Sequence, residues 1–145
     1  MKKVVVFLLF YPTLFLFGQG NGTKYQTGEK KFKLKDYAGA IADLTEWIGD
    51  YEIYKNPDPK AFYMRGVSKL MLHDYRGAIR DLDKAISNDR YNLSISTSFP
   101  NGSQYYYRGV AKIKTGDNNG GCADLSTAGE LGDSQAYEII AKHCN

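Results

Sequence analysis

A five-residue pattern occurs three times in this chain of 145 residues, and it restricts the fold more than any other feature. Residues 78–82 (AIRDL) repeat residues 40–44 (AIADL), 38 positions earlier, and residues 121–125 (GCADL) repeat them again 43 positions later. The same offsets align residues 63–66 (YMRG) with residues 106–109 (YYRG). Self-similarity with a period of about 20–50 residues is typical of repeat arrays, whose units bury their apolar faces against one another. We therefore expect stacked copies of one unit.

The most complete unit, residues 61–87, has the pattern of two short amphipathic helices that meet at a turn. In its first half, residues spaced by three and four line one side of a helix: Phe62, Gly66, Lys69 and Leu70. Asp74 follows and can cap the second helix by accepting a backbone N–H, worth about 1 kcal/mol. The inward stripe of that helix is Ala78, Leu82, Ala85 and Ile86. Gly66 and Ala78 are small, and we expect the two backbones to approach closely there.

This unit resembles the tetratricopeptide repeat (TPR), a helix–turn–helix repeat of 34 residues. Four positions of the family pattern carry the resemblance, namely an aromatic residue, a glycine, a small residue and a later alanine. They are Phe62, Gly66, Ala78 and Ala85 in the second unit, and Tyr105, Gly109, Gly121 and Ala128 in the third. The chain departs from the pattern where Arg replaces Leu, Leu replaces an aromatic residue and Lys replaces Tyr, at Arg65, Leu82, Lys69 and their counterparts Arg108, Leu125, Lys112. The family's closing Pro is missing.

The resemblance covers about residues 22–132 and implies an all-α fold. We expect a right-handed superhelical array of about three TPR hairpins plus a C-terminal capping helix, in one domain over residues 21–145. The expected units are residues 22–51, 59–90 and 102–132, and the capping helix is 133–144. A long Ser- and Asn-rich loop, Asn88–Gln104, with a turn at Pro100–Gly102, is expected between the last two units, and a role in recognition is one interpretation of it.

Residues 1–20 have the pattern of a secretory signal peptide: two lysines, an almost wholly apolar run from Val4 to Phe17, and small residues before a cut after Gly20. That run is shorter than the ~20 residues that span a bilayer, although an uncleaved anchor is the alternative. The chain thus resembles small exported bacterial TPR proteins, located in the periplasm or outside the cell, without stable membrane insertion once the signal is removed. Without the two lysines, 17 basic and 16 acidic residues remain, a balance that argues against nucleic-acid binding.

The two cysteines allow two interpretations. Cys122 and Cys144 lie 10 residues before and 12 residues after Gly132, on helices expected to be antiparallel. At a rise of about 1.5 Å per residue, the two cysteines lie at similar heights along the two antiparallel helices and therefore close together. An even number of cysteines in an exported chain also favours a disulfide. Alternatively, Cys122 is a small buried hydrophobe, because it aligns with Ile41 and Ile79.

The sequence offers no constellation of catalytic, cofactor-binding or metal-ligating residues, so we expect no enzyme, no cofactor and no metal site. Arg65 and Asp81 recur as Arg108 and Asp124, which we interpret as ion pairs between the two helices of a hairpin. A cluster of lysines near the N-terminal end of the array is interpreted as a solvated helix face: Lys24, Lys30, Lys31, Lys33 and Lys35. Trp47 is expected to fill the core between the first two units, with ligand stacking as the alternative.

The resemblance to TPR proteins also implies a concave face, built from the first helix of each hairpin, that binds a protein or peptide. The expected residues are Tyr25, Phe32, Tyr63, Val67, Leu70, Tyr106, Val110 and Ile113. An apolar, tyrosine-edged groove suits a peptide inserted by anchor side chains. The basic and amide residues with which some relatives grip the C-terminal carboxylates of chaperones are absent, so that activity is not implied. The alternative is a structural or self-associating subunit of an envelope complex, a homo-oligomer without a free groove.

Overall fold

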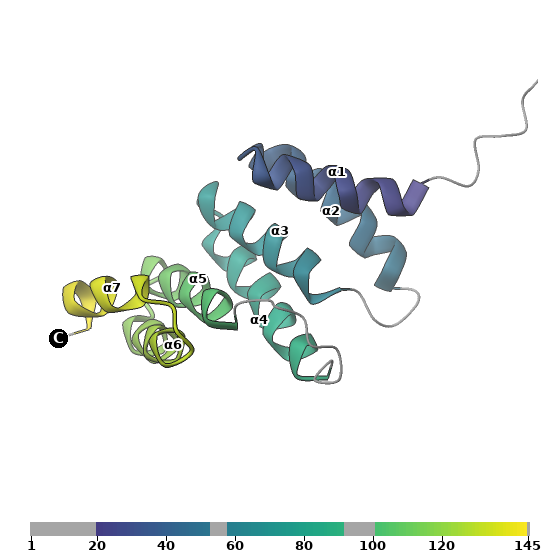
Figure 1. The fold of residues 1–145 in the computed structure, drawn as a ribbon. Coiled ribbons are helices and arrows are strands. Elements are labelled where there is room, and N and C mark those ends of the chain that lie inside the picture. Colours follow the sequence, from purple (N-terminus) through teal and green to yellow (C-terminus); the bar gives the residue numbers. More distant parts are fainter. Residues whose placement is uncertain (1–19, 53–57, 92–100, 145) are drawn as a thin grey trace, which may run out of the picture.

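The computed structural model describes residues 20–52, 58–91 and 101–144 (Figure 1). Within these ranges the chain forms seven α-helices and no strand, which confirms the predicted all-α fold. The helices are α1 (Gly20–Lys33), α2 (Tyr37–Glu52), α3 (Pro59–Met71), α4 (Tyr75–Tyr91), α5 (Asn101–Lys114), α6 (Asn118–Glu130) and α7 (Gln135–His143).

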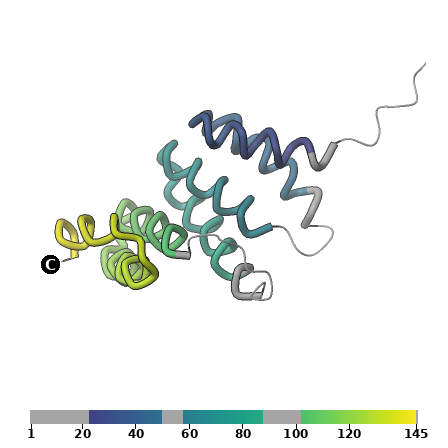
Figure 2. Tube along the Cα trace, viewed as in Figure 1, coloured from purple at the N-terminus to yellow at the C-terminus, as the bar shows by residue number. Residues whose placement is uncertain are grey.

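Consecutive helices pair as three hairpins, α1 with α2, α3 with α4 and α5 with α6, and α7 packs on α6. The first helices of successive hairpins also contact one another, α1 with α3 and α3 with α5. Figure 2 shows the hairpins following one another along the array, from α1 at one end to α7 and the C-terminus at the other. Each hairpin thus packs on its immediate neighbours, which is the construction of a repeat array.

The turns inside the three hairpins share one construction. One residue of each turn adopts a left-handed φ: 62° at Lys35, 65° at His73 and 90° at Gly116. The aspartate that follows accepts the backbone N–H of the residue three positions later, at 3.0, 2.9 and 2.9 Å, in the pairs Asp36–Gly39, Asp74–Gly77 and Asp117–Gly120. The helix cap predicted at Asp74 is therefore confirmed, and Asp36 and Asp117 cap their helices in the same way.

Two glycines bring the helices of a hairpin close together. A Cβ atom added at Gly66 would lie 3.0 Å from Cγ of Leu82 and 3.3 Å from the carbonyl oxygen of Ala78. At Gly109 it would lie 2.8 Å from the carbonyl oxygen of Gly121. The predicted close approach at Gly66 is confirmed, and this contact offsets the cost of about 1 kcal/mol that glycine carries in a helix relative to alanine.

Two of the three hydrophobic clusters cross a border between units, and the third joins the last unit to α7. In the first cluster Trp47, 6% exposed, packs with Phe62 and Met64 of the second unit, and the ring of Tyr25 lies 5.0 Å from the Trp47 ring. Trp47 therefore has the core role that its position predicted. The second cluster joins Leu70, Ala78 and Ala111, and the third joins Leu125, Ala128 and Ala136.

The predicted helix boundaries need correction at the unit borders. The loop expected over Asn88–Gln104 is wrong at both ends, because α4 continues to Tyr91 and α5 begins at Asn101. The expected turn is wrong at Asn101 and Gly102, which belong to α5. The Ser- and Asn-rich composition favoured a loop, whereas packing buries Gln104 to 1% exposure and keeps the segment helical. Residues 92–100 lie outside the described residues.

The N-terminal prediction is not addressed by the structure. The expected signal peptide, residues 1–20, lies outside the described residues except for Gly20, where α1 begins. Within the described ranges, no helix has both the length and the apolar character needed to cross a membrane.

At the C-terminal end, a disulfide joins Cys122 of α6 to Cys144, directly after α7, with the two Cα atoms 5.7 Å apart. This is the pairing that the helix lengths favoured, so Cys122 is not a free buried thiol. The helix expected over residues 133–144 is observed as α7, whose Ala136, Ile139 and Ile140 pack on the third cluster. The disulfide and this apolar contact together hold α7 on the array.

Candidate functional site

The recurrent Arg and Asp residues form ion pairs inside the hairpins. Arg65 donates two hydrogen bonds of 2.8 Å to the carboxylate of Asp81, which Lys69 also contacts at 2.7 Å. The Arg65 and Asp81 side chains are 12% and 5% exposed. The third hairpin repeats this triad with Arg108, Asp124 and Lys112.

Each arginine also reaches the preceding hairpin. Arg65 donates from Nη1 to Oγ1 of Thr45 at 3.2 Å, and Arg108 pairs with Asp83 at 2.7 Å. Thr45 and Asp83 occupy equivalent positions on α2 and α4, separated by the first repeat offset. These shielded, fully paired arginines have a structural role, because they connect the two helices of one unit to the unit before it.

Most of the lysines on α1 are also paired. Lys31 contacts Asp43 at 2.7 Å, at the position equivalent to the Lys69–Asp81 contact, and Lys24 contacts Asp43 at 3.7 Å. Lys33 contacts Glu29 at 3.1 Å. Three lysines of the cluster are thus paired with acidic side chains, and the other two, Lys30 and Lys35, are exposed.

The expected concave-face residues of the first hairpin are half-buried. Tyr25 packs on Trp47, and its hydroxyl donates to the Asp58 carboxylate at 3.0 Å. Phe32 lies with its ring centre 6.4 Å from those of Tyr37 and Tyr63. Both rings lie over the first cluster, where Tyr63 also packs.

The expected residues of α3 and α5 differ in accessibility. Val67 and Leu70 are only 3% and 6% exposed, so they support the surface and offer little area to a ligand. Tyr106, Val110 and Ile113 are half-buried and contact the third cluster. Val110 also packs on the second cluster and so lies where α3 and α5 meet.

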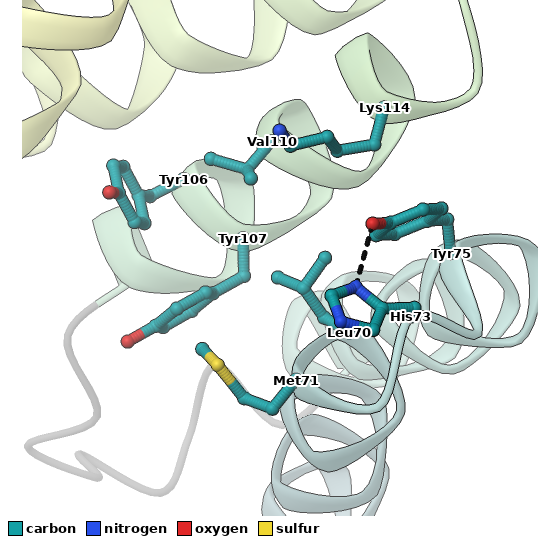
Figure 3. A pocket seen from close by; sticks show the side chains of 8 residues that line it. All are labelled: Leu70, Met71, His73, Tyr75, Tyr106, Tyr107, Val110 and Lys114. Atoms are coloured by element: carbon teal, nitrogen blue, oxygen red, sulfur yellow. Dashed lines mark hydrogen bonds between the residues drawn. The ribbon is translucent and has the colours of Figure 1, made fainter.

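A hollow of about 270 Å³ lies between α3 and α5, and we call it the α3–α5 hollow (Figure 3). Its lining residues are Leu70, Met71, His73, Tyr75, Tyr106, Tyr107, Val110 and Lys114. Three of them were expected from the sequence: Leu70, Tyr106 and Val110. The other five were missed, although Lys114 stands one helical turn after Val110 and this spacing could have indicated it.

The hollow is lined mainly by aromatic and aliphatic side chains, together with the imidazole of His73 and the amine of Lys114. Tyr107 lies edge-on to Tyr106 and Tyr63, with ring centres 5.1 and 6.0 Å away. At the mouth, Nδ1 of His73 and the hydroxyl of Tyr75 form a hydrogen bond of 2.8 Å (Figure 3). The Lys114 side chain is exposed and runs back along α5 beside Val110 (Figure 3).

Burial and the nearby Asp133 raise the pKa of the Tyr106 phenol, and burial with the neighbouring Tyr106 raises the pKa of Tyr107. Burial also raises the pKa of Tyr63, which lies beside Tyr107. These hydroxyls therefore stay protonated at neutral pH and act as neutral hydrogen-bonding groups on an apolar wall. The hollow can hold an apolar group and can hydrogen-bond at its edges.

Metal and thiol chemistry find no support in the part of the chain that the structure describes. No three His, Cys, Asp or Glu side chains there are grouped in a way that could hold a metal ion. Both cysteines are in the disulfide, so neither provides a nucleophilic thiol.

No protein-family model and no curated protein sequence matches this chain. Solved structures do match it. The second TPR domain of human RPAP3 in complex with the HSP70 peptide SGPTIEEVD has a TM-score of 0.69 and 22% identity, over 87% of this chain and 96% of that one. The first TPR of Spaghetti (RPAP3), bound to the HSP90 peptide SRMEEVD, has a TM-score of 0.69 and 21% identity, over 87% of this chain and 91% of that one. The Arabidopsis OM64 TPR domain has a TM-score of 0.67 and 21% identity, over 86% and 96%.

Proposed function

We propose, from the premise that this chain has the tetratricopeptide repeat fold, that it is a non-catalytic scaffold that binds a peptide segment of a protein partner on its concave face. The observation that carries the proposal is the α3–α5 hollow, which lies between the first helices of two successive hairpins. Apolar and aromatic side chains line most of it, and binding surfaces are enriched in such residues. Two of the similar structures hold peptides, which supports this use of the fold.

The peptide that suits this chain differs from the two in those structures. Both of those peptides end in EEVD and are strongly acidic. In this chain, α1 carries Tyr25 and Glu29, and Glu29 is already paired with Lys33 and Lys60. The rest of the face is aromatic or aliphatic. Affinity would therefore come mainly from apolar anchor side chains.

We also propose that the protein is exported and acts in the periplasm or outside the cell. The apolar N-terminal segment with its two lysines supports export. The disulfide between Cys122 and Cys144 supports it independently, because disulfides persist in oxidising compartments. Protease accessibility of the protein in intact cells, in cells with only the outer membrane permeabilised and in lysed cells tests this proposal. Digestion only after complete lysis would contradict it.

A crosslinking pull-down from the native cells tests binding on the concave face. The wild-type chain is compared with a Tyr63→Ala/Tyr106→Ala variant and with Tyr137→Ala as the matched control. Tyr137 is 60% exposed on α7, away from the hollow. A partner captured by wild type and by Tyr137→Ala, but lost by the folded double variant, supports the proposal. Equal capture by all three would place the site elsewhere.

A second candidate function is self-association as a structural subunit of a larger complex. Exposed leucines at the turns favour it, since Leu34, Leu72 and Leu131 are 69%, 49% and 49% exposed. Sedimentation over a wide concentration range separates the two functions. A monomer that captures a peptide supports the scaffold, and a concentration-dependent oligomer that captures none supports the structural subunit.

A further inference from the structure

Lys114 places a positive charge at the α3–α5 hollow, and Asp133, the acid that acts on Tyr106 and Tyr107, is not among the residues that line it. Among the residues that the structure describes, its lining includes Lys114 and His73 but no Asp or Glu. Lys69 and Lys112, the other lysines of α3 and α5 beyond the first turn, are bound to Asp81 and Asp124. Lys114 has no such pairing with any described residue, so its ammonium group stands at an apolar surface ready for an external anion.

The size of the hollow restricts what can enter it. Sites for small molecules and cofactors span about 300–1,000 Å³, and this hollow of about 270 Å³ falls just below that range. It can hold one large apolar side chain but not a cofactor. Met71, 41% exposed at the mouth, adds a flexible wall that adapts to different side chains.

The aromatic surface continues beyond the hollow. From Tyr107 it passes to Tyr63 of α3 and then to Phe32 of α1, with ring centres 6.0 and 6.4 Å apart. A peptide with its anchor in the hollow therefore has further apolar surface to cross, which suits an internal segment more than a chain end.

We propose that the α3–α5 hollow binds an internal peptide segment in which a large apolar residue is flanked by an acidic side chain, the apolar residue filling the hollow and the carboxylate pairing with Lys114. This inference rests on the proposed peptide-binding function and names the class of sequence that the site selects. Charge complementarity supports it, because a lone cation beside an apolar surface attracts an anion and disfavours basic segments.

Selection from a library of short random peptides, displayed as internal segments so that no chain end is free, tests the inference. The baits are the wild-type chain, Lys114→Glu and Lys30→Glu. Lys30 is an exposed lysine of α1, distant from the hollow, and so provides the matched control. Both lysines are exposed, so neither change disturbs the core. Circular dichroism of each bait checks this.

The expected result is enrichment of Phe, Tyr, Leu or Met next to Asp or Glu for wild type and Lys30→Glu, and a shift toward Lys or Arg for Lys114→Glu. For one selected acidic peptide, Lys114→Glu should weaken binding roughly two- to fivefold, as expected for an exposed pair. Apolar peptides without an acidic preference, or an acidic preference that survives Lys114→Glu, would overturn this inference and leave the scaffold function standing. If the chain retains no peptide, or binds only a second copy of itself, both this inference and the proposed peptide-binding function would be overturned.

Discussion

Removal of the disulfide gives a stability change that can be calculated from the structure. The bond between Cys122 and Cys144 closes a loop with a sequence separation of 22 residues. The chain-entropy relation for a loop of this length gives about 3 kcal/mol of stabilisation, because the bond restricts the unfolded chain. In the Cys122→Ser/Cys144→Ser variant α7 keeps its packing through Ala136 and Ile140, so the native fold should persist. We expect the free energy of unfolding to fall by about 3 kcal/mol.

Urea unfolding followed by circular dichroism measures this change. With a slope of about 2 kcal/mol per molar urea, a loss of about 3 kcal/mol lowers the midpoint by roughly 1.5 M. The wild-type chain with a reductant should match the double variant, and the variant itself should not respond to the reductant. Thiol titration of the unfolded wild-type chain, before and after reduction, verifies that the bond is present.

A loss below about 1 kcal/mol would refute the reasoning, since the bond would then not restrict the unfolded chain as calculated. A separate early transition, in which α7 alone is released, would also contradict it. In that case the bond would stabilise one helix locally and leave the rest of the array unchanged. Hydrogen exchange of the amides in α7 distinguishes the two cases.

Three further predictions concern the hairpins. Asp81→Asn should destabilise the fold by about 3–5 kcal/mol, because the shielded Arg65 and Lys69 lose their carboxylate partner. Asp83→Asn, at a 54% exposed side chain, should cost about 1 kcal/mol or less. Urea midpoints compare the two variants, and equal losses of stability would contradict the structural role of the triad. Gly121→Ala should lower the free energy of unfolding by about 1–3 kcal/mol, because its Cβ would lie 2.8 Å from a backbone oxygen of α5. Thermal unfolding measures this change, and an unchanged melting temperature would show that the two helices can separate freely. A hydrogen bond from Lys31 lowers the pKa of Asp43 in the folded chain, so the pair stabilises the fold above about pH 4 and this stability is lost as the pH falls through the folded pKa. In Asp43→Asn the free energy of unfolding should therefore fall less steeply as the pH is lowered. The same pH dependence in both chains would argue against the pair.

The hairpin architecture could be predicted because each unit carries local signals that agree. The aspartate cap at Asp74 depends on neighbouring residues along the chain, and the close approach at Gly66 depends on the facing helix of the same unit. The pairing of Arg65 with Asp81 follows from the same two-helix geometry. Because the helix cap, the close contact and the ion pair all agree with the repeat pattern, the fold could be predicted from the sequence.

The hollow could be predicted only in part, because it depends on how one hairpin packs on the next. A repeat period does not determine the offset between α3 and α5, and this offset decides which side chains of α5 face the groove. Tyr107 was missed beside Tyr106 for this reason, and Met71 and His73 became part of the site only through the position of α5. The start of α5 was missed because its Ser- and Asn-rich composition favours a loop, whereas Gln104 is buried in the folded chain.

The arginine contacts between hairpins have a consequence for how such an array lengthens. Arg65 reaches back to position Thr45, and Asp83 is the equivalent position in its own hairpin. If the second hairpin were duplicated in tandem, the arginine of the new copy would find Asp83 of the original as its acceptor, the same contact that Arg108 already makes. A duplicated first hairpin would carry Thr27 at the arginine position and would leave its neighbour without this link. The arginine contact between hairpins would therefore be kept if the second hairpin were duplicated, but it would be lost between two copies of the first hairpin.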